Sequence, residues 1–159
     1  MNDEPAVRAL AAALLARGWR LASAESCTGG LVAAACTSVA GSSDWFERGF
    51  VTYSNESKIE LLGVEPALLE AHGAVSEEVA RAMVRGALAH SRAQLALAVT
   101  GIAGPGGAVP GKPVGTVWLA WGDASGIRAE RLQLAGDRAA VRAGTVAAAL
   151  ARLIEAARS

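Results

Sequence analysis

The chain has 159 residues, of which 52% are hydrophobic and only 4% aromatic, and its 15 Lys and Arg residues balance 15 Asp and Glu residues. This length suits a single domain over residues 1–159, with one core built largely from small alanine and valine side chains. A balanced charge without a basic run argues against a nucleic-acid partner, and the lack of a signal peptide or a membrane-spanning apolar run predicts a cytoplasmic protein with no membrane partner.

Helix and strand patterns alternate through the first hundred residues. Leucines at helical spacing before Gly18 are typical of a helix, and Ser54 or Asn55 and Ser76 suit helix N-caps. The expected elements are, in chain order, a helix over 5–17, a strand over 19–26, a helix over 28–39, an irregular segment over 41–49, a strand over 50–54, and helices over 55–63, 65–73 and 77–91.

The second half of the chain contains a buried strand, a glycine- and proline-rich loop, and a hairpin. The elements expected here are a continuous apolar strand over 94–104, an irregular loop over 104–115, paired strands over 116–122 and 127–134, and a helix over 138–157 that Asp137 caps. The sequence therefore predicts an α/β fold. It is a three-layer α/β/α sandwich with a mixed, mostly parallel sheet and a C-terminal antiparallel hairpin followed by a long helix.

Polar, glycine-containing segments follow three of the predicted strands. They read ESCTGG (residues 25–30), YSNESK (53–58) and TGIAGPGG (100–107). In open α/β sheets, ligands bind beyond the carboxyl ends of the strands. We therefore expect these three segments to form one site.

The segment ESCTGG suits a nucleophile beside an anion-binding helix start. Ser26 and Cys27 are the candidate nucleophiles, and the backbone amides of residues 27–30 could stabilise an oxyanion. Gly29 and Gly30 would let a substrate approach the backbone closely. The alternative is that Ser26 and Thr28 only cap the helix, and the residues themselves favour neither reading.

Lys58 falls in the first turn of its predicted helix, where the helix dipole disfavours a positive charge. If it is partly buried, it could act as a neutral amine base, with Tyr53 sharing or relaying the proton. A surface lysine on an amphipathic helix is the simpler reading, and spacing alone favours it.

Two further groups could contact a ligand. Thr100, Gly101, Gly104 and Gly106 belong to an open loop that suits a phosphate or a planar ring, although it matches neither a P-loop nor a dinucleotide fingerprint. Arg138 and Arg142 stand four residues apart, on one helix face, and could bind a phosphate. A plain surface loop and solvated arginines are the alternatives.

Taken together, these segments resemble the CinA C-terminal domain family. The matching stretches follow the family's order and spacing over residues 20–142, and they read AESCTGG, GSSDWFERGFVTYSNESK, LGV, HGAVSEEVA, TGIAGPGG, KPVGTVW and GDRAAVR. The resemblance implies hydrolysis of nicotinamide mononucleotide to nicotinate mononucleotide and ammonia. It also implies roles for individual residues, with Ser26 as nucleophile, Lys58 as base, Tyr53 assisting, Thr100 and the following glycines as a substrate loop, and Arg138 and Arg142 near the substrate.

A serine–lysine pair needs no metal and no cofactor. His72 and His90 lie outside the three polar segments ESCTGG, YSNESK and TGIAGPGG, and no Cys/His set has metal-ligand spacing. Cys27 is the competing nucleophile. Its side chain is expected to point away from that of Ser26, into the core, if the strand continues to alternate.

Two other functions stay open: a regulatory module that binds a nucleotide without hydrolysing it, and an amidase for another amide-bearing nucleotide. We also expect a homo-oligomer, because Trp45, Phe46, Trp118 and Trp121 would favour an interface if they were exposed. Gly29 and Gly101 are expected to serve activity rather than folding, by allowing positive φ or close ligand approach.

Overall fold

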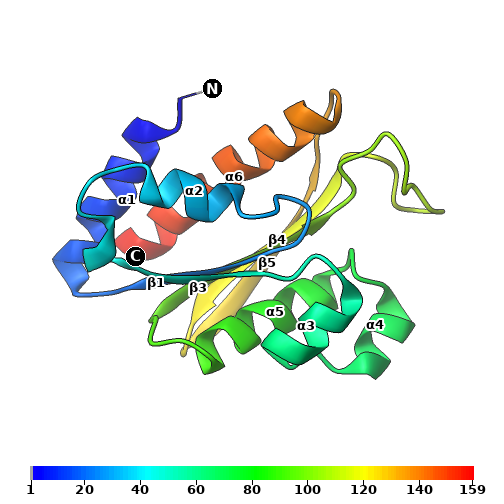
Figure 1. The fold of residues 1–159 in the computed structure, drawn as a ribbon, viewed down its shortest axis with the longest axis horizontal. Coiled ribbons are helices and arrows are strands. Elements are labelled where there is room, and N and C mark those ends of the chain that lie inside the picture. The colour runs from blue at the N-terminus through cyan, green and yellow to red at the C-terminus, as the bar shows by residue number, and fades with distance from the viewer. Residues whose placement is uncertain (1) are drawn as a thin grey trace.

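The computed structural model describes residues 2–159, which form a five-stranded sheet between two layers of helices (Figure 1). The strands are β1 (Leu21–Glu25), β2 (Phe46–Val51), β3 (Leu95–Gly101), β4 (Thr116–Asp123) and β5 (Gly126–Gln133). The helices are α1 (Glu4–Arg17), α2 (Leu31–Thr37), α3 (Asn55–Leu62), α4 (Pro66–His72), α5 (Glu77–Ala89) and α6 (Arg138–Arg158), with a short 3₁₀ turn, η1 (Ser42–Asp44).

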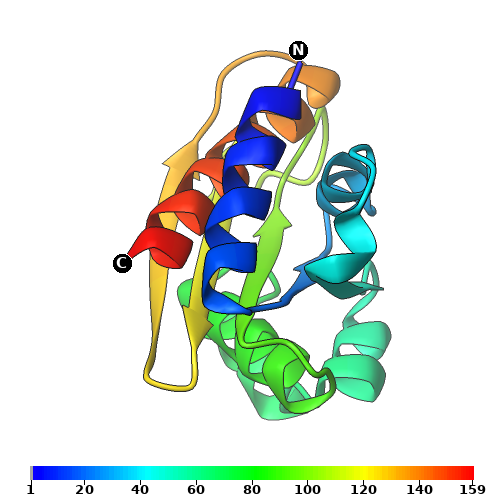
Figure 2. The ribbon, with the colours of Figure 1, turned by 90° about the vertical axis from the view of Figure 1, so that its left-hand side faces the viewer.

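The strand order is β2-β1-β3-β4-β5, with β1 parallel to both β2 and β3, and β4 antiparallel to β3 and β5. Helices α1, α2 and α6 cover one face, and α3, α4 and α5 cover the other (Figures 1 and 2). The predicted sandwich, hairpin and long last helix are confirmed. Because β1, β2 and β3 run in the same direction, the segments that follow them emerge at one edge of the sheet.

The two faces of the sheet carry side chains of different size. On β3, Leu95, Leu97 and Val99 pack with α1, α2 and α6, whereas Ala96 and Ala98 pack toward α5. This alternation follows from the two-residue period of a strand. The side chains that the sheet presents to α5 are therefore small ones.

Two predicted elements differ from the structure. The second strand begins at Phe46 rather than at residue 50, because β2 is an edge strand whose half-exposed side chains include charged ones, so an apolar run does not mark it. Helix α2 spans only Leu31–Thr37, because residues 26–30 form consecutive turns that need positive φ at Gly29 (57°) and Gly30 (109°).

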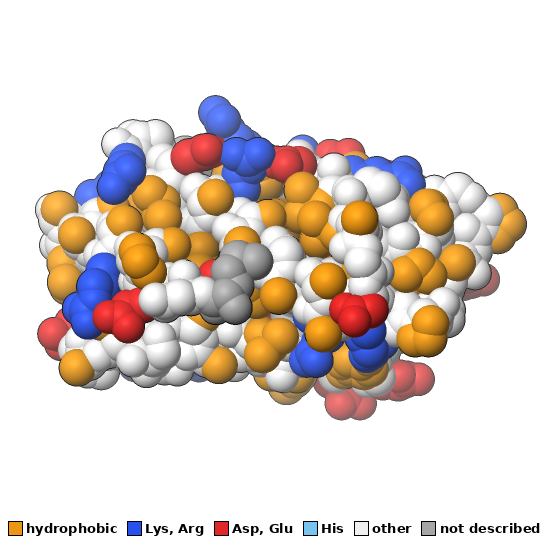
Figure 3. Space-filling model, turned by 90° about the horizontal axis from the view of Figure 1, so that it is seen from above, with side chains coloured by type: hydrophobic (Ala, Val, Ile, Leu, Met, Phe, Trp, Pro, Cys, Tyr) orange, Lys and Arg blue, Asp and Glu red, His pale blue; other side chains and the backbone are white. Residues whose placement is uncertain are grey.

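Two of the tryptophans that would favour an interface if they were exposed are buried. Trp45 is 1% exposed and Trp121 is 8% exposed, and both belong to the core between the sheet and α1 and α6. On the face above α1 and α6, basic and acidic side chains are intermixed with apolar ones (Figure 3). Within residues 2–159, no helix has the length and hydropathy needed to cross a membrane.

Candidate active site

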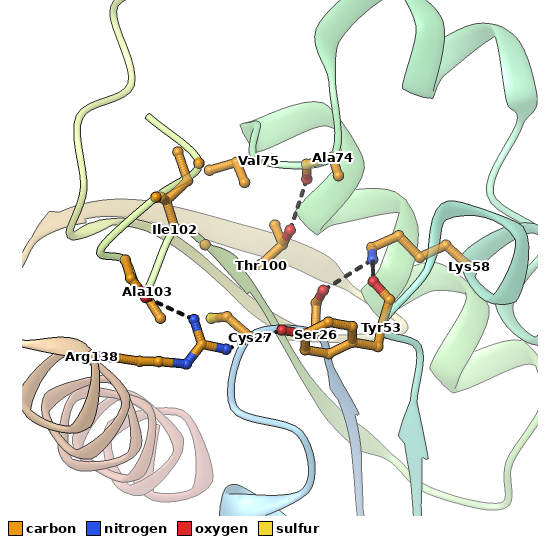
Figure 4. A pocket seen from close by; sticks show the side chains of 14 residues that line it. Ser26, Cys27, Tyr53, Lys58, Ala74, Val75, Thr100, Ile102, Ala103 and Arg138 are labelled. Carbon is orange, nitrogen blue, oxygen red and sulfur yellow. Dashed lines mark hydrogen bonds between the residues drawn. The ribbon is translucent and has the colours of Figure 1, made fainter. Parts of the chain in front are cut away.

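The three predicted loops meet around one cavity of about 270 Å³ at the carboxyl ends of the parallel strands. Ser26 and Cys27 contribute from the first loop, Tyr53 and Lys58 from the second, and residues 100–104, 106 and 107 from the third (Figure 4). Arg138, at the start of α6, lies at the same cavity. The prediction of a common site is therefore confirmed in its geometry.

Lys58 and Ser26 are in direct contact inside the protein. The Lys58 side chain is 1% exposed, and its Nζ lies 3.0 Å from Ser26 Oγ. The Nζ also donates to the carbonyl oxygens of Thr52, at 2.7 Å, and Tyr53, at 3.3 Å. The reading of Lys58 as a surface lysine is wrong.

The start of α3 explains why Lys58 points inward. Ser54 caps the helix by accepting from the amide of Ser57 at 3.0 Å, so the chain turns sharply after β2 and the first helical turn faces the strand ends. Burial lowers the pKa of Lys58 from its usual 10.5 to about 8. A substantial fraction of this amine is therefore neutral in mildly alkaline solution and able to accept a proton.

The first amides of helix α2, which the sequence suggested as an anion site, already have an acceptor within the protein. The amides of Val32 and Ala33 donate to the buried carboxylate of Glu25, at 2.8 and 3.0 Å, so a ligand cannot use them. The amide of Gly29 donates to the carbonyl of Ser26. Within residues 2–159, no oxygen atom accepts from the amides of Cys27 and Thr28. Of the two residues, only Cys27 lines the cavity, so its amide, next to Ser26, is the donor that could receive an oxyanion.

Three residues of this turn, Thr28, Gly29 and Gly30, do not line the cavity, although the sequence predicted that they contact substrate. The hydroxyl of Thr28 donates to Glu25 at 2.6 Å in the interior. The two glycines shape the turn through their positive φ. From this loop, Ser26 and Cys27 are the residues that line the cavity.

Cys27 lies at the edge of the core, with 6% of its surface exposed. Burial raises the pKa of its thiol to about 11, so the thiolate is scarce near neutral pH. Ser26, which contacts Lys58, is the better-placed nucleophile.

Replacement of Cys27 by alanine should therefore retain amide hydrolysis within about threefold of the wild-type kcat, because the thiol is not in its reactive form. Steady-state kinetics of the folded variant checks this. A loss as large as that caused by Ser26→Ala would transfer the nucleophile to Cys27.

The two arginines of α6 have different contacts, although the sequence grouped them together. Arg138 lines the cavity, where it donates to the carbonyl of Gly104 at 2.8 Å and to the hydroxyl of Tyr53 at 3.1 Å. Arg142 lies behind the turn and donates to the carbonyls of Cys27, at 3.1 Å, and Thr28, at 3.3 Å. Only Arg138 is placed to meet a substrate.

Tyr53 contacts Lys58 through its carbonyl oxygen rather than through its hydroxyl. Its ring is 60% exposed, and the hydroxyl accepts from Arg138 across the mouth of the cavity. Among the described residues, no hydrogen bond joins the phenol to Ser26 or Lys58. The proton relay that the sequence suggested is therefore absent from this arrangement.

The third loop lines the cavity opposite Lys58. Thr100 is 1% exposed and donates to the carbonyl of Ala74 at 2.8 Å, which ties the loop to the segment before α5. Gly104 and Gly106 line the cavity as predicted. Gly101 also lines it, but a Cβ there would lie 2.7 Å from Val117 Cγ2 and 3.0 Å from the carbonyl oxygen of Thr116, so packing against β4 requires this glycine.

Sequence reasoning missed two contributors to the site. The carbonyl of Thr52 holds Lys58, and nothing in the sequence marks a backbone acceptor. Glu25 organises the turn, and its signal was present, because it is the acidic residue at the head of ESCTGG, just before a helix start.

The CinA C-terminal domain family matches residues 3–157. A Pseudomonas putida protein named nicotinamide-nucleotide amidohydrolase PncC is 59% identical over 86% of this chain and 85% of its own. The Escherichia coli K12 protein of that name is 54% identical over 89% and 86%. A crystal structure of a CinA superfamily protein from Klebsiella pneumoniae 700603 superposes with a TM-score of 0.95 at 42% identity, covering 99% of this chain and 98% of that one. The chain therefore belongs to the CinA C-terminal domain family.

Proposed function

We propose that the chain hydrolyses the carboxamide of nicotinamide mononucleotide, giving nicotinate mononucleotide and ammonia, with Ser26 as nucleophile and Lys58 as general base. Relatives that are 54–59% identical over most of their length are named nicotinamide-nucleotide amidohydrolases, which supports this activity. The observation that carries the mechanism is the buried 3.0 Å contact between Lys58 Nζ and Ser26 Oγ.

The geometry around Lys58 suits proton abstraction. The carbonyls of Thr52 and Tyr53 accept two of its N–H groups, which leaves the third tetrahedral position of the nitrogen facing Ser26. When that position holds a lone pair, Lys58 takes the hydroxyl proton as Ser26 Oγ attacks the amide carbon. The amide of Cys27, which lines the cavity beside Ser26, donates to the oxyanion that forms.

Collapse of the tetrahedral intermediate needs an acid. Protonated Lys58 returns the proton to the departing nitrogen, so ammonia leaves and an ester of nicotinate mononucleotide with Ser26 remains. A water molecule then attacks this ester while Lys58 again serves as base. The ester breaks, and Ser26 regains its proton from Lys58.

The cavity also suits a phosphorylated pyridine nucleoside. Val75, Ile102 and Ala103 give it an apolar wall, against which a pyridinium ring can lie. Arg138 supplies a cation at the mouth, where its bond to the Tyr53 hydroxyl can be exchanged for one to phosphate. Arg138 is therefore our candidate for phosphate recognition, and Tyr53 is its partner in the unliganded site.

We further expect a single-domain, cytoplasmic protein that forms a homo-oligomer. The buried positions of Trp45 and Trp121 remove part of the motive for an oligomer. Light scattering decides the subunit number.

The proposal is tested by ammonia release from nicotinamide mononucleotide, with chromatography of the nucleotide product, for the wild type beside Ser26→Ala. The wild type should form nicotinate mononucleotide. Ser26→Ala should lose at least about 10³-fold in kcat, because the nucleophile is gone, but should still bind nicotinamide mononucleotide in calorimetry.

The other outcomes identify the competing functions. Binding by the wild type without ammonia release would favour the regulatory module. Release from a different amide-bearing nucleotide, and not from nicotinamide mononucleotide, would keep the chemistry and change the substrate.

A further inference from the structure

Glu25 is a buried carboxylate that the proposed chemistry of Ser26 and Lys58 does not use. It is 1% exposed and does not line the cavity. Its side chain accepts three hydrogen bonds, from the hydroxyl of Thr28 and from the amides of Val32 and Ala33. These bonds fix the far end of the turn that begins at Ser26, because they tie the first residues of α2 back to the end of β1.

Arg142 holds the same turn from the other side. Its guanidinium reaches over from α6, donating through Nε to the carbonyl of Cys27 and through Nη2 to the carbonyl of Thr28. A Cβ on Gly29 would lie 3.6 Å from Arg142 Nη2, so the guanidinium lies directly against the turn. The Glu25 carboxylate accepts hydrogen bonds from N–H and O–H groups, and the Arg142 guanidinium donates hydrogen bonds to carbonyls. The two side chains therefore bind complementary groups of one short segment.

The planarity of the peptide bond links these contacts to catalysis. In a trans peptide, the C=O and the following N–H point in opposite directions. When Arg142 binds the carbonyl of Cys27, it therefore fixes the orientation of the peptide that follows Cys27. The bond from the Gly29 amide to the Ser26 carbonyl fixes the preceding peptide in the same way, and no oxygen atom among residues 2–159 accepts from the amide of Cys27.

We propose that Glu25 and Arg142 are positioning residues that hold the turn after Ser26, and with it the amide of Cys27, in place as an oxyanion donor. The inference rests on the proposed function, since it concerns the oxyanion of that reaction. It also replaces the sequence-based role of Arg142, because a guanidinium that binds two carbonyls behind the turn is not free to bind a phosphate in the cavity.

The test compares Glu25→Gln and Arg142→Met with matched controls elsewhere. Glu47→Gln alters another carboxylate that accepts a backbone amide, that of Arg92, far from the cavity. Arg152→Met alters another arginine of α6, which pairs with Glu130. Both site variants should lose about 10- to 100-fold in kcat with KM within about threefold, because a misaligned donor weakens transition-state rather than ground-state binding. The controls should keep wild-type kinetics.

Binding and labelling separate positioning from substrate contact. In a Ser26→Ala background, Arg142→Met should leave the Kd for nicotinamide mononucleotide within about twofold. With Ser26 intact, both site variants should react at least about 10-fold more slowly with a fluorophosphonate probe. In that reaction the Ser26 Oγ–P bond forms, the P–F bond breaks, fluoride leaves, and the serine proton passes to Lys58, while the phosphonyl oxygen occupies the oxyanion position.

The remaining outcomes either overturn or uphold the positioning role of Glu25 and Arg142. Wild-type kcat and labelling rates in folded variants would overturn the proposal, as would a loss of nucleotide binding in Arg142→Met, which would make Arg142 a substrate contact. If Arg142→Met fails to fold, Arg142→Lys, which can still reach one carbonyl, is judged by the same criteria. Slow labelling of the variants, with no ammonia release from nicotinamide mononucleotide by the wild type, would uphold the positioning role and reject the proposed substrate.

Discussion

Replacement of Lys58 by methionine should lower kcat for amide hydrolysis by about 10²–10⁴-fold, the range expected when a general base is lost. Methionine nearly matches the length of the lysine stem and is apolar, so the cavity beside Ser26 stays filled. The fold should survive, because removing a desolvated amine leaves no uncompensated charge in the interior. Kinetics and thermal unfolding of the purified variant measure both effects. Lys112→Met, at the only other lysine, is the matched control and should behave as the wild type does.

The pH dependence gives this prediction a second measurement. Because burial lowers the pKa of Lys58 to about 8, kcat/KM should rise with pH and level off above that value as the amine becomes neutral. Between about pH 8 and 10.5 the unfolded chain binds more protons at this lysine than the folded chain does. The free energy of unfolding of the wild type, relative to Lys58→Met, should therefore increase with pH through that window. A flat rate profile between pH 6 and 10 would exclude Lys58 as the base.

The position of the site could be predicted from the sequence, whereas the burial of its base could not. ESCTGG, YSNESK and TGIAGPGG each follow a strand pattern, and parallel strands bring such segments to one edge. The inward direction of Lys58 depends on how α3 packs against α5 and on two carbonyls of the preceding residues. Those contacts are set by tertiary structure. The residues around Lys58, taken by themselves, have the pattern of an ordinary surface helix.

The arginines of α6 illustrate a second limit. Their four-residue spacing correctly predicts that Arg138 and Arg142 leave the helix on one side. The spacing carries no information on what faces each one. Arg138 emerges beside the cavity and Arg142 one turn later, where the turn after β1 lies against the helix. A shift of one helical turn therefore separates a candidate substrate contact from a structural one.

A glycine to which the sequence analysis gave no role lies where α5 contacts α3, the helix that carries Lys58. Gly86 lies on α5 where α3 ends, and a Cβ there would overlap the carbonyl oxygen of Leu62 and lie 2.8 Å from its carbonyl carbon. Backbone atoms cannot rotate out of the way as a side chain can. The alanine of Gly86→Ala must therefore push α3 away from α5, and α3 carries Lys58.

Gly86→Ala should lower the free energy of unfolding by about 3 kcal/mol, the upper part of the range for overpacking, even though alanine favours a helix. For a chain of this size, that corresponds to a fall in Tm of about 6–12 °C. Gly144→Ala makes the same change within α6, where the nearest atom to the new Cβ is Leu134 Cδ1 at 3.4 Å. That control should keep or raise Tm, because alanine favours a helix and its Cβ meets no backbone atom there.

In the fraction of Gly86→Ala that stays folded, kcat should also fall, since a displaced α3 moves Nζ of Lys58 away from Ser26 Oγ. Wild-type stability in Gly86→Ala would show that α3 and α5 can separate without cost, and that their close approach does not place the base.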